Sequence, residues 1–225
     1  LEDPVEIKME GINQSQVDSS RDYTFAKGLR SLLRQDPDIC MVGEIRDLET
    51  AEIAIQAALT GHLILSTIHT NSASGTIPRF LSMGVKPFLL APALNSVIGQ
   101  RLVRKICEHC QEEDKLTSEQ KERVLKNLET LPAAEKKNVD FKKLKFYKGK
   151  GCKECSGLGY KGRIGIYEIF TMNKEIEQAI LSAEVSEYVI QELAVKSGMI
   201  TMVQDGLLKA LDKITTAEEV FRVIE

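Results

Sequence analysis

Two Cys-x-x-Cys pairs, Cys107/Cys110 and Cys152/Cys155, constrain the fold of this chain more than any other feature, because 41 residues separate them. Each pair makes a tight turn that presents two thiolates, and two such turns supply the ligands of a tetrahedral structural zinc site. Four protein ligands leave no open position for a substrate, so we expect the metal to support folding rather than catalysis. The site closes only if residues 104–162 fold back until Cys110 and Cys152 meet.

Other uses of the cysteines are less favoured. Four unrelated free thiols, or a redox pair of the thioredoxin type, fit less well, since neither pair opens a helix after a strand. His109 lies between two expected ligands, and we interpret it as a flanking surface residue rather than a replacement ligand. The fifth cysteine, Cys40, lies in the apolar run 39–42, where a buried thiol fills space. This cysteine usage fits a reducing cytoplasm.

Composition argues against several classes of protein. The chain has 225 residues, of which 43% are hydrophobic and 28% charged, and its formal net charge is −3. This charge argues against a dedicated nucleic-acid-binding protein, which usually has a basic footprint. The apolar runs are shorter than the roughly 20 residues of a membrane span, and the first residues carry no signal-peptide pattern. Seven lysines against Asp140 at 136–150 predict a solvated loop or hairpin, with contact to acidic lipid or a partner as the alternative.

Hydrophobic periodicity predicts alternating helices and strands in the first hundred residues. Thr24 and Asp47 are the expected N-caps of two helices, and Gly61 suits the position after the second one. Two continuous apolar runs predict strands buried on both faces of a parallel sheet. Pro78 is expected to kink or break its helix. In chain order we expect a helix at 24–35, a strand at 39–45, a helix at 48–59, a strand at 62–69, and helices at 72–83 and 87–103.

Residues 104–162 change in character to a charged, lysine-rich and glycine-rich stretch. We expect a small insert with too few apolar side chains for a core of its own, so that zinc supplies much of its folding free energy. Thr215 and Glu218 are expected to form a capping box before the last helix. After the insert we expect a strand at 163–170 and helices at 173–182, 186–197, 201–212 and 216–225.

These patterns predict an α/β fold in three parts. Residues 1–103 form a doubly wound core, residues 104–162 the tetracysteine zinc insert, and residues 163–225 a return strand with a C-terminal helical bundle. Ligands of such sheets bind beyond the carboxyl ends of the strands, where Glu44 and His69 fall. Glu44 there is suited to hold Mg²⁺ or to orient the water that attacks a phosphate. Taken singly, an acid or a histidine at a strand end is more often a structural or surface residue.

Three spaced motifs resemble those of a known family. The segment Glu2 to Glu6 resembles an acidic box, Leu33 to Asp47 a Walker B segment, and Thr60 to Asn71 a histidine box. The order of these motifs and the tetracysteine insert are similar to those of the secretion and pilus-assembly ATPases, the hexameric motors of type II secretion and type IV pili. The resemblance covers nearly the whole chain. The insert resembles that of the assembly members rather than the retraction members, and whether the parent builds pili or exports proteins stays open.

The resemblance implies roles for named residues. The core would be RecA-like, with Glu44 serving Mg²⁺ and Glu6 positioning or deprotonating the hydrolytic water. His69, and less certainly His62, would sense the γ-phosphate of ATP or couple it to movement. The implied partners are five further copies in a homo-hexamer and an inner-membrane platform protein, with no nucleic acid. The implied location is the cytoplasm, peripherally associated with the inner membrane through partners, which leaves room for direct membrane contact.

One departure from the family is decisive for activity. The phosphate-binding loop, Gly-x-x-x-x-Gly-Lys-Ser/Thr, does not occur, and its nearest look-alike, residues 149–151, lacks the hydroxyl residue and the spaced first glycine. In the family this loop lies upstream of the acidic box, and the chain begins like a cut inside a longer protein. We therefore expect an active parent ATPase and an inactive fragment. The alternative is a non-catalytic zinc-binding interaction module, since residues 152–159 also match one repeat of Hsp40-like chaperones.

Overall fold

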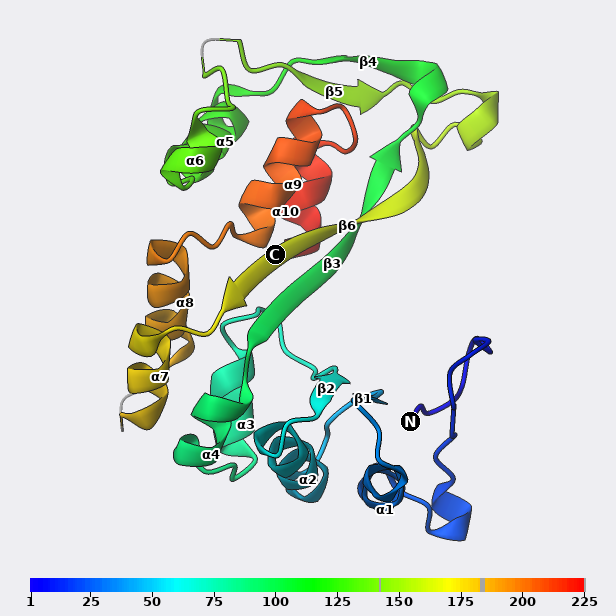
Figure 1. Cartoon of the computed structure of the whole chain (residues 1–225). Coiled ribbons are helices and arrows are strands. Elements are labelled where there is room, and N and C mark those ends of the chain that lie inside the picture. The colour runs from blue at the N-terminus through cyan, green and yellow to red at the C-terminus, as the bar shows by residue number, and fades with distance from the viewer. Residues whose placement is uncertain (142, 183–184, 225) are drawn as a thin grey trace. The chain divides into compact units, whose positions relative to one another are not determined.

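The computed structural model describes residues 1–141, 143–182 and 185–224 (Figure 1). Lys142, within the lysine-rich run, and Glu225, the last residue of the expected C-terminal helix, lie outside the described residues. The chain forms two compact units. Unit 1 comprises residues 1–96 and 171–193, and unit 2 comprises residues 97–170 and 194–225. The mixed α/β fold predicted from the sequence is confirmed.

Unit 1 is built on two parallel strands, β1 (Ile39–Val42) and β2 (Leu63–Ser66), which pair in register from Ile39 with Leu63 to Val42 with Ser66. Helices α1 (Phe25–Leu32) and α2 (Leu48–Leu59) pack against each other on the same side of these strands (Figure 1). As predicted, the side chains of Thr24 and Asp47 cap these helices by accepting from backbone amides three residues on. The expected chain reversal after α2 is also confirmed, with Gly61 at φ +101°.

The prediction that the strand at 39–45 is buried on both faces is wrong. Cys40 and Val42 are buried, whereas Ile39 and Met41 are 60% and 49% exposed. On β2, Leu63 and Leu65 are exposed on the same face as their partners Ile39 and Met41. Alternate strand residues point to opposite faces, and the described helices cover one face. The apolar residues of the other face therefore remain uncovered in the described part of the chain.

The region between residues 72 and 106 differs from two predictions. Helix α3 (Thr76–Ser82) begins later than expected, so Pro78 lies in its first turn, where a missing amide hydrogen breaks no helical hydrogen bond. The helix expected at 87–103 is wrong: α4 (Pro87–Ala93) is followed by the strand β3 (Ser96–Ile106). Pro92 lies near the end of α4, and the following residues instead pair with a distant strand. Helices α7 (Lys174–Leu181) and α8 (Glu187–Lys196) match their predictions, and α4 contacts α7.

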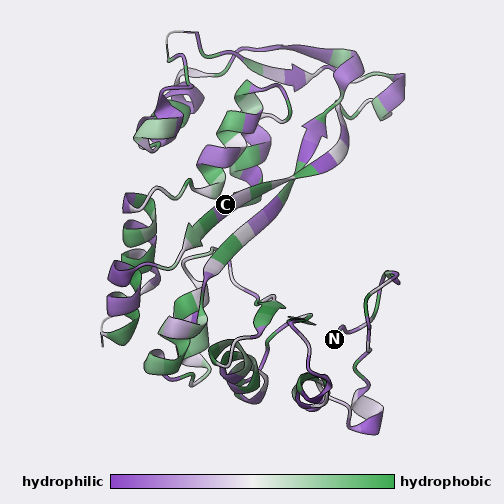
Figure 2. Ribbon diagram, viewed as in Figure 1, coloured by the Kyte–Doolittle hydropathy of each residue, from purple (hydrophilic) through white to green (hydrophobic). Residues whose placement is uncertain are grey.

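Unit 2 contains two further pairs of strands. The strand β6 (Tyr160–Thr171) includes the return strand expected at 163–170 and pairs with β3, running in the opposite direction (Figure 1). These two strands run across the expected boundaries at 103/104 and 162/163. The antiparallel strands β4 (Gln111–Asp114) and β5 (Phe146–Gly149) enclose α5 (Ser118–Glu129) and α6 (Ala133–Lys136) in the sequence. In Figure 2, β4 is hydrophilic, whereas α4 of unit 1 is hydrophobic.

The insert shares a hydrophobic core with the C-terminal helices α9 (Met202–Leu211) and α10 (Ala217–Ile224). The insert thus has its core in common with these helices, and apolar burial against α9 and α10 stabilises it, while a large contribution of zinc to its folding free energy stays a prediction. The buried members from the insert are Leu116, Val124, Leu128, Leu131 and Phe146, and those from the helices are Leu207, Ala210, Ala217 and Phe221.

The start of α10 differs from its prediction by one residue. Thr216, not Thr215, is the N-cap, because its Oγ1 accepts a hydrogen bond of 3.0 Å from the amide of Glu219. The hydroxyl of Thr215 instead donates to the carbonyl of Arg104. Glu219 is buried and binds the guanidinium groups of Arg104 and Arg222, so the carboxylate that follows the cap three residues later links α10 to β3 rather than completing a capping box.

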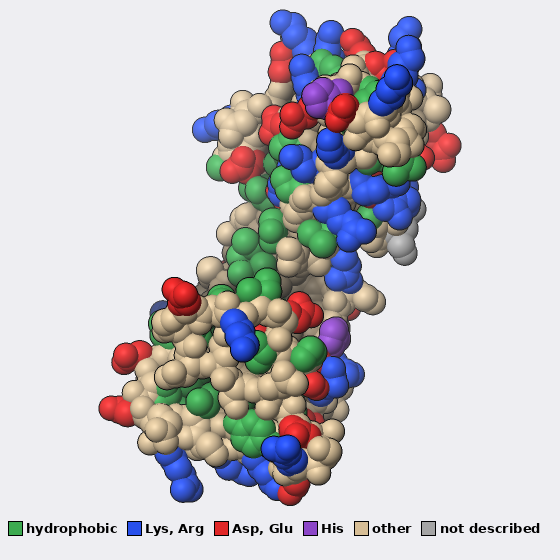
Figure 3. Space-filling model, turned by 90° about the vertical axis from the view of Figure 1, so that its right-hand side faces the viewer, with side chains coloured by type: hydrophobic (Ala, Val, Ile, Leu, Met, Phe, Trp, Pro, Cys, Tyr) green, Lys and Arg blue, Asp and Glu red, His purple; other side chains and the backbone are tan. Residues whose placement is uncertain are grey.

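The lysine-rich run contributes the strand β5, which pairs with β4 from outside the run, so the described residues of the run do not form a hairpin by themselves. Lys148 and Lys145 form ion pairs of 3.3 and 3.5 Å with Asp114 and Glu113 of β4. In the upper part of Figure 3, Lys and Arg side chains alternate with Asp and Glu side chains, so that face carries both signs of charge. None of the helices in the described part of the chain has both the length and the apolar character that a membrane span requires.

Candidate functional site

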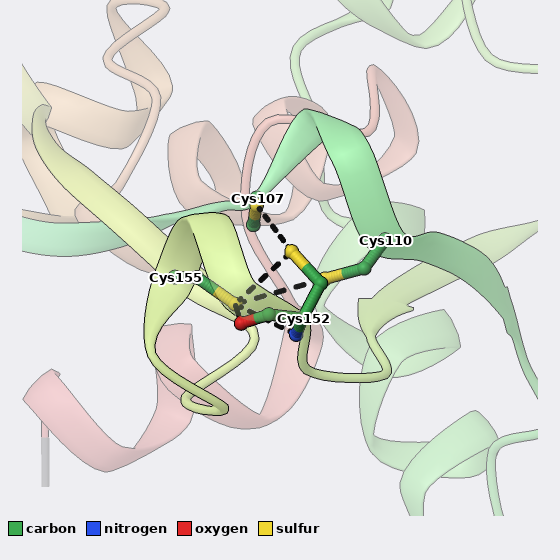
Figure 4. Close-up of side chains that lie close together, drawn as sticks. All are labelled: Cys107, Cys110, Cys152 and Cys155. Atoms are coloured by element: carbon green, nitrogen blue, oxygen red, sulfur yellow. Dashed lines mark hydrogen bonds between the residues drawn. The ribbon is translucent and has the colours of Figure 1, made fainter.

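The four cysteines predicted to bind zinc meet in unit 2 (Figure 4). Cys107 follows β3 directly, Cys110 precedes β4, and Cys152 and Cys155 lie in the turn between β5 and β6. The four sulfur atoms all lie within 4.8 Å of one another. The fold-back that the sequence requires is therefore present.

The spacing of the sulfur atoms fits a tetrahedral ion. The Sγ–Sγ distances are 3.8 Å between Cys107 and Cys152, 3.9 Å between Cys110 and Cys155, and 3.7 Å between Cys152 and Cys155. A tetrahedron with metal–sulfur bonds of about 2.3 Å has edges of about 3.8 Å. The residues present therefore fit a zinc ion with four thiolate ligands, whereas His109 is exposed and is not a member of the cluster.

Backbone amides around the second pair favour a thiolate. The amides of Cys152 and Gly159 each donate to Sγ of Cys155 over 3.2 Å. Burial raises the pKa of Cys155, but these amides outweigh it and lower the pKa to about 6. Burial raises the pKa of Cys110 to about 12, so this thiol needs the charge of a bound cation to lose its proton at neutral pH.

A close backbone contact holds the two cysteine turns together. The amide of Cys107 donates to the carbonyl of Gly159 over 2.9 Å, and the amide of Lys150 donates to the carbonyl of Cys110 over 2.9 Å. Gly159 has φ +76°, and a Cβ atom at this residue would lie 2.5 Å from the carbonyl oxygen of Gly149. Only glycine is compatible with this approach, which closes the turn that carries Cys152 and Cys155.

The second cluster lies in unit 1, where β1 and β2 end. Nε2 of His69 donates to Oε2 of Glu44 over 3.1 Å, although 25 residues separate them in the sequence. Two contacts of Thr67 hold the ends of the strands together: its carbonyl accepts from the amide of Ile45 over 2.9 Å, and its hydroxyl donates to the carbonyl of Gly43 over 2.6 Å. The parallel register thus brings together the two polar side chains that the sequence placed at strand ends.

Arg46 is a member of this cluster whose contact the sequence reasoning missed. Its Nη2 atom lies 2.6 Å from Oε1 of Glu44, whose side chain is 12% exposed. The hydrogen bond from Arg46 is the main reason that the pKa of Glu44 is lowered, and His69 adds to this while burial opposes it. The same bond raises the pKa of Arg46, with a further contribution from the carboxylate of Asp3. The signal in the sequence was that Arg46 follows Glu44 by two residues, a spacing that puts both side chains on one side of an extended chain.

The structure does not bring Glu6 or His62 to this cluster. Glu6 is exposed in the N-terminal segment, which joins the end of β1 through the hydrogen bond from the amide of Gly43 to the carbonyl of Leu1. His62 lies at the opposite end of β2 from His69. Its Nδ1 donates to the carbonyl of Ala57 over 3.1 Å, and the imidazole faces a groove of about 530 Å³ between α1, α2 and α4. No hydrogen bond or ion pair in the described residues joins either side chain to Glu44.

The family model described as "Type II/IV secretion system protein" matches residues 1–222, and the chain belongs to this family. It is 49% identical over 226 residues to the type IV pilus assembly ATPase PilB of Thermus thermophilus. This match covers 100% of this chain and 24% of PilB. It is 44% identical over 225 residues to the type II secretion system protein E of Klebsiella pneumoniae, covering 100% of this chain and 42% of that protein. The chain thus spans less than half the length of these relatives.

The fold is similar to that of a solved pilus motor. The crystal structure of the pilus retraction motor PilT with bound ADP superimposes with a TM-score of 0.64 at 27% sequence identity. The match covers 98% of this chain and 50% of the PilT chain. The ATPase DotB of Legionella pneumophila shares the fold, with a TM-score of 0.59 at 20% identity.

Proposed function

We propose that this chain is the C-terminal motor portion of a hexameric ATPase that powers pilus or pseudopilus assembly, in type IV pilus biogenesis or type II protein secretion. The observation that carries the proposal is the Glu44–His69 contact at the carboxyl ends of two parallel strands, in a chain of the secretion family. This is where an open α/β sheet binds a nucleotide. The named activities of PilB and PilT add support.

The core of the full-length protein is RecA-like in this proposal, and these residues make up part of it. The exposed apolar face formed by Ile39, Met41, Leu63 and Leu65 supports a larger sheet and further covering elements in the parent. A phosphate-binding loop would come from upstream of the acidic box, since none occurs in the 225 residues. The chain by itself would hydrolyse ATP at background, because backbone amides and a lysine of that loop hold the β- and γ-phosphates.

Four side chains have separate roles in ATP hydrolysis in this proposal. Bound magnesium supplies charge neutralisation at the β- and γ-phosphates. Glu44 would hold the ion through its carboxylate, and His69, in contact with that carboxylate, would sense the γ-phosphate. Glu6 would position or deprotonate the hydrolytic water. His62 lies at the far end of β2, so its role would be to transmit a movement of the strand rather than to touch the phosphate.

The tetracysteine cluster has a structural role in this proposal. Zinc held by Cys107, Cys110, Cys152 and Cys155 would close the turns of the 104–162 insert, between the 1–103 core and the 163–225 region. The full-length protein would form a homo-hexamer on an inner-membrane platform protein, in the cytoplasm and peripheral to the membrane. A non-catalytic zinc-binding module would account for the cysteines and leave the Glu44–His69 contact without a role.

Carboxylate replacements in the full-length protein test the proposal. Glu44→Gln and Glu6→Gln should each lower the rate of ATP hydrolysis by about 100-fold or more while nucleotide binding is retained. Glu52→Gln and Glu10→Gln remove other exposed carboxylates of unit 1 and serve as matched controls with unchanged rates. Wild-type rates from Glu44→Gln, or rapid turnover by the 225-residue chain alone, would contradict the proposal.

A further inference from the structure

The backbone that carries Glu44 and Arg46 is held at both ends. Ile45, between them, is buried, and its amide donates to the carbonyl of Thr67 over 2.9 Å. Asp47, the next residue, is the N-cap of α2. The ion pair between Glu44 and Arg46 shows that their side chains point to the same side, and the two backbone attachments leave the segment little freedom to separate them. Only the side chains of the pair can adjust.

The two carboxylate oxygens of Glu44 have different partners. Oε1 lies 2.6 Å from Nη2 of Arg46, and Oε2 accepts from Nε2 of His69 over 3.1 Å. The charge-assisted contact with Arg46 is the shorter, and such contacts are the stronger class of hydrogen bond. Arg46 and His69 are 62% and 83% exposed, whereas the Glu44 side chain is 12% exposed. Each oxygen of the buried Glu44 carboxylate is therefore bound by a side chain that is itself exposed to solvent.

We propose that Arg46 is a positioning residue, which fixes the rotation of the Glu44 carboxylate so that the oxygen shared with His69 is presented to the reaction. This inference rests on the proposed function of Glu44. Without the guanidinium, Oε1 has no ion-pair partner among the described residues, and only the contact of Oε2 with the exposed His69 restrains the last torsion angle of Glu44, which has broad minima. The negative charge of Asp3, in the acidic segment, also helps to raise the pKa of Arg46.

Replacement of Arg46 in the full-length protein tests this role. Groups that orient a metal-binding carboxylate contribute about 10-fold to 100-fold to metal affinity or activity. We therefore expect Arg46→Ala to lower kcat by that factor and to raise the magnesium concentration for half-maximal rate about 10-fold. Binding of a fluorescent ATP analogue without magnesium should stay within about 2-fold of wild type, because Arg46 acts through Glu44 rather than on the nucleotide.

Two further variants separate positioning from general structure. Arg46→Lys keeps a positive charge that can donate to Oε1, so it should restore most of the loss. Arg30→Ala removes an exposed arginine that pairs with Glu49 on α2, and it should leave kcat and the magnesium dependence unchanged. In a Glu44→Gln background, Arg46→Ala should cause no additional loss.

Several outcomes would overturn the inference. One is an Arg46→Ala protein with wild-type kcat and magnesium dependence while Glu44→Gln is inactive, which removes the role of Arg46 and keeps the proposed function. Another is loss of magnesium-free nucleotide binding without rescue by Arg46→Lys, which indicates a structural role. Additive losses in the double variant would also refute it. Wild-type activity of Glu44→Gln would instead refute the proposed function itself.

Discussion

Glu219 should stabilise unit 2 by an amount that depends on pH, and Glu219→Gln measures it. The side chain is 1% exposed, and both oxygens accept from two guanidinium groups. Nη2 of Arg104 lies 2.6 Å from Oε2, and Nη2 of Arg222 lies 2.6 Å from Oε1. The backbone amide of Arg104 donates to Oε1 over 3.1 Å. Glutamine keeps the shape and removes the charge, leaving both arginines without their counter-ion.

The magnitude follows from the pKa of this carboxyl. Burial raises it, but the hydrogen bonds from Arg222 and Arg104 prevail and lower the pKa from 4.5 to about 2. That difference corresponds to about 3 kcal/mol in favour of the folded state at pH 7. The two arginines are 43% and 57% exposed, so solvent screening reduces this value somewhat. We expect Glu219→Gln to cost about 2–3 kcal/mol at pH 7.

The sign of the pH dependence is fixed by the lowered pKa. The stabilisation is complete above pH 4.5, where Glu219 is ionised in both states, and it disappears as the pH falls toward about 2. The gap in unfolding free energy between wild type and Glu219→Gln should therefore be widest at pH 7 and narrow between pH 4.5 and pH 2. Urea unfolding followed by circular dichroism measures the gap, and hydrogen exchange of the Arg104 amide reports local opening.

A control variant tests whether the loss of any carboxylate from unit 2 lowers the free energy of unfolding. Glu154→Gln removes an exposed carboxylate of unit 2 that lies 3.5 Å from Lys161, and it should change stability by less than about 0.5 kcal/mol. A loss for Glu219→Gln that is the same at pH 2.5 and pH 7 would mean that packing, not charge, explains it. A loss below about 1 kcal/mol at pH 7 would refute the reasoning.

Three further predictions concern the metal, the shared core and a cap. Cys107→Ser should reduce bound zinc from one ion per chain to near zero by elemental analysis, with new protease cleavage confined to the cysteine turns; one zinc retained would contradict the four-thiolate site. Leu128→Ala, at a fully buried position, should cost about 2–5 kcal/mol in urea unfolding, against almost nothing for Leu158→Ala, which is 70% exposed. Asp47→Ala should cost about 1 kcal/mol, and an unchanged midpoint would show that the cap is dispensable.

Much of the local structure was predictable because local interactions determine it. A threonine or aspartate before an amphipathic stretch caps its own helix, so Thr24 and Asp47 needed no knowledge of the rest of the chain. The pairing of thiols within each Cys-x-x-Cys was predictable because two residues between cysteines place both thiols on one turn. The same holds for the meeting of Glu44 and His69, since parallel strands end at one edge of a sheet.

The failures of prediction occurred where distant residues compete with local preference. The apolar stretch after Pro92 satisfies a helical pattern, but the strand β6 offers a backbone partner from more than fifty residues away, and β3 forms instead. Thr215 and Glu218 satisfy a capping pattern, yet burial of Glu219 against Arg104 and Arg222 places the cap one residue later. The strand β6 and the side chain of Arg104 both lie far along the sequence from the segments they affect, so a pattern of neighbouring residues does not reveal them.

The sequence by itself determined which residues could bind a metal or a proton, because thiolates, carboxylates and imidazoles keep their ligand properties in any fold. Only the tertiary structure decided which of them lie together. It joined Arg46 to Glu44, left His62 at the far end of β2, and packed the insert on α9 and α10. The reason is physical: hydrogen bonds and apolar contacts require approach within a few ångströms, and chain folding rather than spacing sets that approach.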